Sequence, residues 1–236
     1  MNKIPSNHKG LLLTVVLCGC IWSCSPQQPT APILLGPPLP DPAIFFQNQI
    51  ATAVPADSLS LDEIAQLQVG DVLLRRGYGL ISDYIVAALE EPCALTHAGL
   101  IVQQGHQLGV LHTASSSEHD GTLVESLTAY VQQSQAHSLV AFRPQCTPAQ
   151  RQKLLALAQV YEQQALPFDY QFDDQNSEAL YCLELLRDLF LEAFKQDYLP
   201  FHHYRGELSL LGFQSFFDKR KFILLFNHCS TNPSVE

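Results

Sequence analysis

Basic residues are scarce in this chain. It has 13 Lys and Arg residues against 23 Asp and Glu residues, so its formal net charge is -10. No run of basic residues is longer than the three at 219–221. Proteins that bind nucleic acid neutralise phosphates with clustered Lys and Arg, so the composition argues against nucleic acid as a partner.

Charged residues of both signs are also few. They make up 15% of the 236 residues, while hydrophobic residues make up 47%. Disordered chains show the opposite balance, because they lack the apolar side chains needed to bury a core. The length fits one domain with flanking segments. The composition therefore predicts a single folded domain.

Closely spaced cysteine pairs are missing beyond residue 57. Cys93, Cys146, Cys182 and Cys229 are far apart, whereas zinc sites and redox dithiols place two cysteines within a few residues. We therefore expect no metal and no other cofactor. Four cysteines can also form two disulfides outside the cytoplasm, and this alternative stands beside any reactive thiol.

The N-terminal apolar run, residues 11–17, is too short to span a bilayer but has the length found in signal peptides. Lys3 and Lys9 flank it on the N-terminal side, and no acidic residue occurs before Asp41. This asymmetry predicts a cleaved signal peptide at residues 1–19.

The residues before Cys20 resemble the lipobox of bacterial lipoproteins, in which the cysteine becomes the lipid-bearing first residue. Cys20 is the expected attachment site, Cys24 is the alternative, and a secretory signal without lipid is a third possibility. Seven of the 15 prolines fall within residues 26–42, so residues 20–57 are expected to form a stiff tether. We expect a lipid-anchored protein of the bacterial cell envelope, on the periplasmic face of a membrane.

Residues 58–236 alternate helix-like and strand-like patterns without an internal repeat. Apolar residues recur at helical spacing or form short runs bounded by turn residues. Helices are expected at residues 59–67, 80–90, 124–133, 148–164 and 178–195, and strands at residues 72–74, 96–103, 108–114 and 138–143. Such a mixture is typical of the α+β class.

Cys182 lies near the start of the last expected helix, whose cap is expected at Asn176 or Ser177. The dipole at this helix end favours a thiolate, which predicts a lowered pKa for the Cys182 thiol. A nucleophilic cysteine also needs a base, most often a histidine. His97 is the best candidate, because an unpaired polar side chain on an apolar strand is costly. A core histidine bonded to backbone is the alternative.

A tight turn at Gly105 and His106 separates the two strands that follow residue 95. With a loop of two or four residues, Gly99 faces His112, and His97 becomes a diagonal neighbour of His112 on the same face. A loop of three or five residues would place the two rings on opposite faces.

Four short motifs, in this order, resemble the circularly permuted papain-like cysteine hydrolases related to NlpC, the YiiX and YaeF group. The match spans residues 68–190. The resemblance implies a permuted papain-like fold over residues 58–236, with a small antiparallel sheet packed against helices. The motifs are Gly70-Asp71-Val72-Leu73, Leu95-Thr96-His97-Ala98-Gly99, Pro167-Phe168-Asp169-Tyr170 and Tyr181-Cys182-Leu183-Glu184.

The resemblance also implies roles for individual residues. Cys182 would be the nucleophile, His97 the base and His112 the residue that orients His97. Asp169 and Tyr181 are candidate substrate-binding residues.

These roles predict a thiol hydrolase, an amidase or peptidase, that cleaves an amide or ester of cell-envelope peptides through a thioester. A hydrolase or acyltransferase of acyl lipids is one alternative, and a catalytically silent lipoprotein that binds a ligand in the same cleft is another. The sequence departs from the family at Leu183, where Ser is usual, and at His112, where YiiX-like members often have Glu. These departures bear on substrate preference and on the role of His112 in orienting His97.

Overall fold

The computed structural model describes residues 56–116, 119–172, 178–205 and 208–229. The expected signal peptide, both candidate lipid-bearing cysteines and nearly all of the expected tether lie outside the described residues, as do Asn176 and Ser177. Within the described ranges, no helix is both long enough and apolar enough to cross a bilayer.

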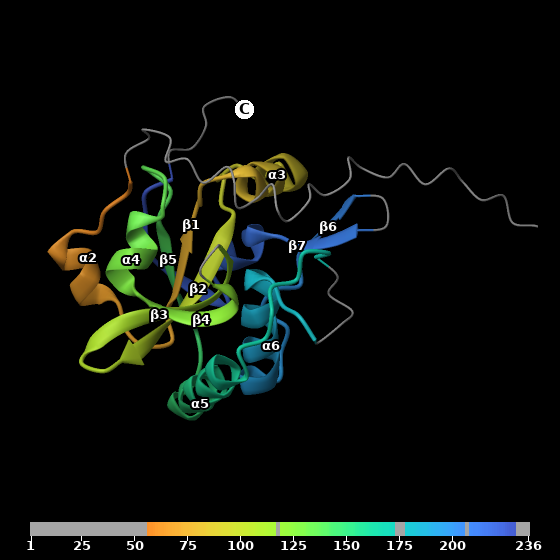
Figure 1. Ribbon diagram of the computed structural model, residues 1–236. Coiled ribbons are helices and arrows are strands. Elements are labelled where there is room, and N and C mark those ends of the chain that lie inside the picture. The colour runs from red at the N-terminus through yellow and green to blue at the C-terminus, as the bar shows by residue number, and fades with distance from the viewer. Residues whose placement is uncertain (1–55, 117–118, 173–177, 206–207, 230–236) are drawn as a thin grey trace, which may run out of the picture. The chain divides into compact units, whose positions relative to one another are not determined.

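A six-stranded antiparallel sheet forms the centre of the fold, in the order β4-β3-β2-β1-β5-β8 (Figure 1). A separate hairpin of β6 (His202–Arg205) and β7 (Leu208–Leu211) forms a second sheet. The α+β class and the small antiparallel sheet are therefore confirmed. The strands of the main sheet are β1 (Val72–Arg75), β2 (His97–Gln104), β3 (Gln107–Ser115), β4 (Asp120–Ser126), β5 (Val140–Pro144) and β8 (Phe222–Asn227).

Helices cover both faces of this sheet (Figure 1). One face packs against α5 (Pro148–Gln164) and α6 (Cys182–Phe194). The other face lies toward α2 (Leu61–Gln66) and α4 (Leu127–Gln132). A further helix, α3 (Leu80–Leu89), follows β1, and a 3-10 helix, η1 (Phe213–Phe217), precedes β8.

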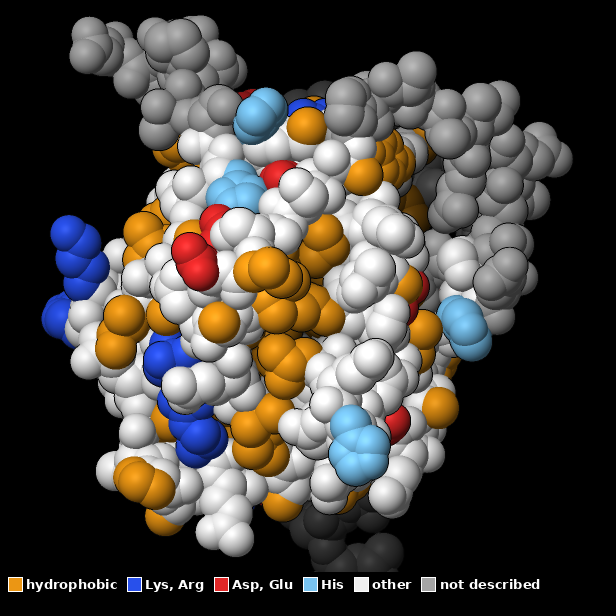
Figure 2. All heavy atoms as spheres, turned by 90° about the vertical axis from the view of Figure 1, so that its left-hand side faces the viewer, with side chains coloured by type: hydrophobic (Ala, Val, Ile, Leu, Met, Phe, Trp, Pro, Cys, Tyr) orange, Lys and Arg blue, Asp and Glu red, His pale blue; other side chains and the backbone are white. Residues whose placement is uncertain are grey.

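The two faces bury separate hydrophobic clusters, because successive side chains of a strand point to opposite sides. Val72 and Leu74 of β1 belong to the larger cluster with α6, and Leu73 belongs to the smaller one with Tyr130 of α4. Figure 2 shows the side on which α2 lies, where hydrophobic side chains form a patch and a few charged and histidine side chains lie around it. The sheet thus separates the hydrophobic cluster that contains α6 from the one that contains α4.

Residues 124–133 were expected to form one helix, and this prediction is wrong. Residues up to Ser126 continue β4 and pair with β3, and the helix begins at Leu127. The hydroxyl of Ser126 accepts a hydrogen bond from the backbone N–H of Ala129 at 3.2 Å. A serine at this position caps a helix start, so Ser126 ends the strand and begins α4.

The last long helix also begins later than the expected residue 178. The carboxylate of Glu184 accepts the backbone N–H of Tyr181 at 2.8 Å, which caps the helix there. An isolated parallel bridge pairs Leu180, two residues before Cys182, with Phe168. Cys182 is therefore the first residue of α6.

The N-terminal end of the described domain is held by Asp57. Its carboxylate accepts the backbone N–H groups of Ser138 and Leu139 at 2.9 and 3.1 Å. Nδ1 of His228 lies 3.1 Å from the same carboxylate. Asp57, which directly precedes the expected domain start at residue 58, is thus tied to the residues before β5 and to the residue after β8.

A disulfide joins Cys93 to Cys229, with Cα atoms 6.0 Å apart. Of the cysteines in the described ranges, Cys146 and Cys182 are free. The thiol that a nucleophilic role requires is therefore available at Cys182.

Candidate active site

Cys182 lies at the N-terminus of α6, against the start of β2. The residue is 5% exposed, and the backbone N–H groups of Ala98 and Leu183 form hydrogen bonds to its sulfur. Burial removes the thiolate from water and outweighs these amides, so the pKa of the Cys182 thiol is raised to about 12. The lowered pKa expected from the helix dipole is therefore wrong for this structure.

His97 is the first residue of β2 and meets His112 of β3. Gly105 and His106 form a two-residue turn between these strands, and φ at Gly105 is +60°. Nε2 of His97 lies 2.8 Å from Nδ1 of His112, and the two rings meet edge to face. The prediction that both histidines share one face of the sheet is confirmed.

Gly99 leaves the space that the His112 side chain occupies. A Cβ atom at residue 99 would press on Cγ1 of Val110 and would lie 3.1 Å from the carbonyl oxygen of Leu111 and 3.3 Å from Cβ of His112. Side-chain packing therefore accounts for glycine at this position in the strand.

Tyr130 and Arg75 complete the surroundings of the two imidazoles. The Tyr130 ring stacks on His97 at 5.7 Å and meets His112 edge-on at 5.2 Å, measured between ring centroids. The Arg75 guanidinium lies 4.5 Å from the centre of the Tyr130 ring and donates to the carbonyl of Gln133. Sequence analysis identified neither residue, although Arg75 directly follows the expected strand at 72–74.

Both imidazoles are neutral near pH 7. Burial lowers the pKa of His97 well below its ordinary value of 6.5, and the charge of Arg75 lowers it further. Burial also lowers the pKa of His112, although Glu125 opposes this effect. The resting site thus contains a neutral thiol and two neutral rings. Among the described residues, no hydrogen bond joins the Cys182 thiol to the His97 ring.

Asp169 and Tyr181, the candidate substrate-binding residues, lie next to the start of α6 and are each 4% exposed. A carboxylate oxygen of Asp169 accepts the backbone N–H of Gln171 at 2.8 Å. The hydroxyl of Tyr181 accepts the backbone N–H of Leu211 at 3.1 Å. These contacts support the local structure, and a role in substrate binding stays a prediction.

The other free cysteine, Cys146, is half-buried, and burial raises the pKa of its thiol. It lies beside Arg151 and belongs to a different part of the molecule. Across the described ranges, no group of three or more His, Cys, Asp or Glu side chains is placed to hold a metal ion.

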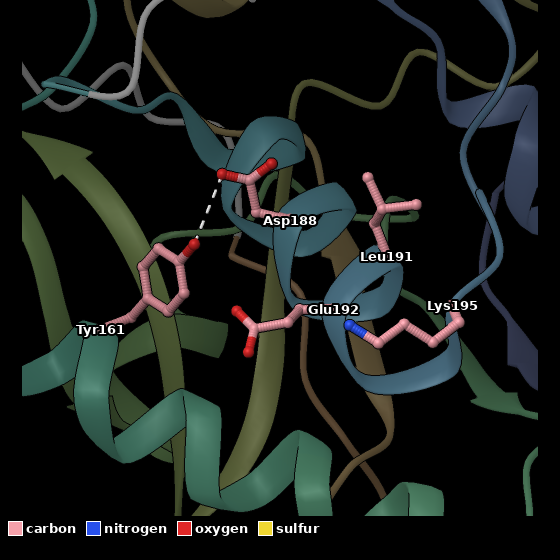
Figure 3. Close-up of a pocket in the computed structure, with 5 residues that line it drawn as sticks. All are labelled: Tyr161, Asp188, Leu191, Glu192 and Lys195. Atoms are coloured by element: carbon pink, nitrogen blue, oxygen red, sulfur yellow. Dashed lines mark hydrogen bonds between the residues drawn. The ribbon is translucent and has the colours of Figure 1, made fainter.

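A hollow lies between α5 and α6 (Figure 3). Cys182, His97 and His112 do not line it. The Tyr161 hydroxyl donates a hydrogen bond to Asp188 there, at 3.4 Å. Asp188 lies about 9 Å from Cys182 along the helix axis, at 1.5 Å per residue. The hollow therefore does not include the cysteine or the two histidines. Its lining residues are Tyr161, Asp188, Leu191, Glu192 and Lys195.

A family model and a solved structure resemble this chain. A family model described as the permuted papain-like amidase enzyme, YaeF/YiiX, C92 family matches residues 66–200. A solved structure described as the metalloprotein YiiX from Escherichia coli O157:H7 is similar, with a TM-score of 0.59 and 16% sequence identity over 70% of this chain and 99% of that chain. No curated protein matches the chain. The chain therefore belongs to the YaeF/YiiX family of permuted papain-like amidases.

Proposed function

We propose that this chain is a thiol amidase whose nucleophile is Cys182. The sulfur attacks the substrate carbonyl while His97 accepts the thiol proton as general base. The C–N bond then breaks, the protonated His97 gives its proton to the leaving amine, and a thioester remains. Water attacks the thioester with His97 again as base, which releases the acid and restores the thiol.

One observation carries this proposal. The 2.8 Å contact between His97 Nε2 and His112 Nδ1 occurs at the start of β2, where the Ala98 amide bonds the Cys182 sulfur. Because Nε2 of His97 is used by His112, Nδ1 is the nitrogen left to accept the thiol proton.

Because the pKa of the Cys182 thiol is raised, we expect the thiol to give its proton to His97 as the sulfur attacks. A resting pair of thiolate and protonated His97 is disfavoured. Catalytic hydrogen bonds are often long in an enzyme without substrate and tighten when substrate binds. We therefore expect the hydrogen bond between the Cys182 thiol and the His97 ring to form only when substrate binds. The backbone N–H groups in the first turn of α6 have no carbonyl partner one turn earlier in the helix, and they are the candidate donors to the oxyanion.

Peptides of the bacterial cell envelope are the proposed substrates, and lipid on Cys20 is the proposed link to the periplasmic face of a membrane. Mass spectrometry of the mature N-terminus tests the anchor. Lipid on Cys20 supports it, lipid on Cys24 moves the boundary, and an unmodified cysteine still joined to the preceding residue overturns it.

Acylation by p-nitrophenyl acetate tests the nucleophile without knowledge of the natural substrate. We expect a burst of p-nitrophenol and a mass gain of one acetyl group on Cys182, both lost in Cys182→Ala. Cys146→Ser is the matched control, because it removes the other free thiol of the described residues, and it should retain the burst. A burst that survives Cys182→Ala would refute the proposal.

A parallel screen of envelope peptides and acyl lipids then decides the substrate class. Amide cleavage that depends on Cys182 supports the proposal. Cleavage confined to acyl lipids favours the lipid hydrolase, and turnover of neither class favours a silent binding protein.

A further inference from the structure

Glu125 of β4 is a diagonal neighbour of His112 of β3. In the same way, His112 is a diagonal neighbour of His97 of β2. In the pairing of β3 with β4, Val110 faces Glu125 and His112 faces Leu123. Glu125 and His112 are thus diagonal neighbours on one face of the sheet. Glu125 could not be recognised from the sequence pattern, because residues 124–133 were expected to form a helix.

The facing atoms of Glu125 and His112 are complementary and otherwise unpaired. Nε2 of His112 lies 3.5 Å from Oε2 of Glu125, at the limit of a hydrogen bond. Both atoms are buried, and neither has another hydrogen-bond partner in the described part of the chain. Leaving two such groups unpaired is costly, so a small closing movement that pairs them is favourable.

The carboxylate of Glu125 is ionised near pH 7 and therefore accepts protons in hydrogen bonds without donating any. Burial raises its pKa, but contact with His112 and the charge of Arg75 outweigh burial, and the pKa is lowered. The side-chain amide of Gln133 donates to its other oxygen at 2.6 Å. The Tyr130 ring meets the His112 ring edge-on.

The contact between His97 and His112 is ambiguous without a third group. A neutral imidazole has one N–H, so either ring can be the donor in the bond from His97 Nε2 to His112 Nδ1. If His112 donates, the proton of His97 sits on Nδ1, and that nitrogen cannot take the thiol proton. The wrong tautomer of a catalytic histidine abolishes most of its activity even where the geometry is intact.

We infer that Glu125 is a positioning residue that removes this ambiguity through His112. Its carboxylate holds the His112 proton on Nε2, so Nδ1 of His112 must accept, His97 must donate from Nε2, and Nδ1 of His97 is left bare. The inference rests on the proposed function for its catalytic meaning. The tautomers themselves are a property of the folded chain and can be measured in an inactive variant.

Nitrogen-15 NMR of the full chain with Cys182→Ala tests the tautomers directly. We expect both rings to carry their protons on Nε2. In Glu125→Gln the amide can donate to His112, so both protons should move to Nδ1, whereas Glu125→Asp should retain Nε2. Glu162→Gln on the exposed face of α5 is the control for loss of one negative charge and should change nothing. Unchanged tautomers in Glu125→Gln would overturn the inference.

Activity with Cys182 in place gives the second measurement. Glu125→Gln should lower kcat for p-nitrophenyl acetate by roughly 100-fold, within the range of general acid-base contributions, and leave KM nearly unchanged. Glu125→Asp should recover part of kcat. A shift of tautomers without loss of kcat would refute the catalytic meaning of the inference. If Cys182→Ala is fully active, the proposed function fails while the NMR result still stands.

Discussion

Nε2 of His97 and Nδ1 of His112 lie 2.8 Å apart, and each ring keeps one further nitrogen outside this contact. On His97 the remaining nitrogen is Nδ1, and on His112 it is Nε2. His112 can therefore hold the His97 ring without occupying Nδ1, the nitrogen that accepts the thiol proton in the proposed mechanism.

His112→Ala should lower kcat/KM for p-nitrophenyl acetate by roughly tenfold to a thousandfold, as expected for loss of support to a general base. His112→Gln should retain more activity than His112→Ala, because its amide oxygen can still accept from His97. Steady-state kinetics measure the effect, and urea unfolding of each variant checks the fold. Full activity in His112→Ala would show that His112 does not orient His97.

Gly99→Ala should destabilise the fold by about 1–3 kcal/mol, the range for inserting a methyl group into a packed site. The new Cβ would press on Cγ1 of Val110 and approach His112, so activity should fall as well. The cost should shrink in a Val110→Ala background, where that methyl group is removed. Urea unfolding of the four chains measures the coupling, and an unchanged cost would contradict the packing account.

His228 should stabilise the protein most strongly in mildly acidic solution. Burial opposes its charged form, but Glu63 and Asp57, at 2.7 and 3.1 Å, outweigh burial and raise the pKa of His228 above 6.5. Its contribution is therefore complete below pH 6.5 and is lost as pH rises through the raised value. The pKa values of Asp57 and Glu63 are lowered from 3.8 and 4.5, so their contribution is lost only in stronger acid.

His228→Gln tests the direction of this pH dependence. The difference in unfolding free energy from wild type should be about 1.5–3 kcal/mol near pH 5.5, the range for hydrogen bonds to charged groups, and smaller at pH 9. His106→Gln, at the exposed hairpin turn, should show no such dependence on pH. A loss that grows toward pH 9 would contradict the assignment.

Replacing both cysteines of the disulfide, Cys93→Ser with Cys229→Ser, should lower the free energy of unfolding by about 2–5 kcal/mol. The disulfide closes a sequence separation of 136 residues, so its loss mainly frees the unfolded chain. Urea unfolding measures the change, and Cys146→Ser serves as the comparison because that thiol is free. Equal midpoints for the double variant and Cys146→Ser would contradict a stabilising role.

Much of the candidate site could be predicted from local features. The Gly105 turn sets the pairing of β2 with β3, and the alternation of side chains along a strand then places His97 and His112 together. Four motifs in order, the last of them around Cys182, led to the family, and a helix does begin at that residue. The place of Glu125 in the site could not be predicted, because residues 124–126 fit the apolar spacing of the helix that follows them. These residues form a strand only because they pair with β3.

The sequence by itself determined the α+β class, the family, the shared face of the two histidines and a cysteine at a helix start. These features depend on neighbours along the chain and on the length of one turn. Tertiary structure decided the pairing of Cys93 with Cys229, the surroundings of the histidines and the direction of the Cys182 pKa shift. Desolvation depends on which distant segments cover a group, and the packing of α6 against β2 buries the thiol more strongly than the helix dipole favours its charge.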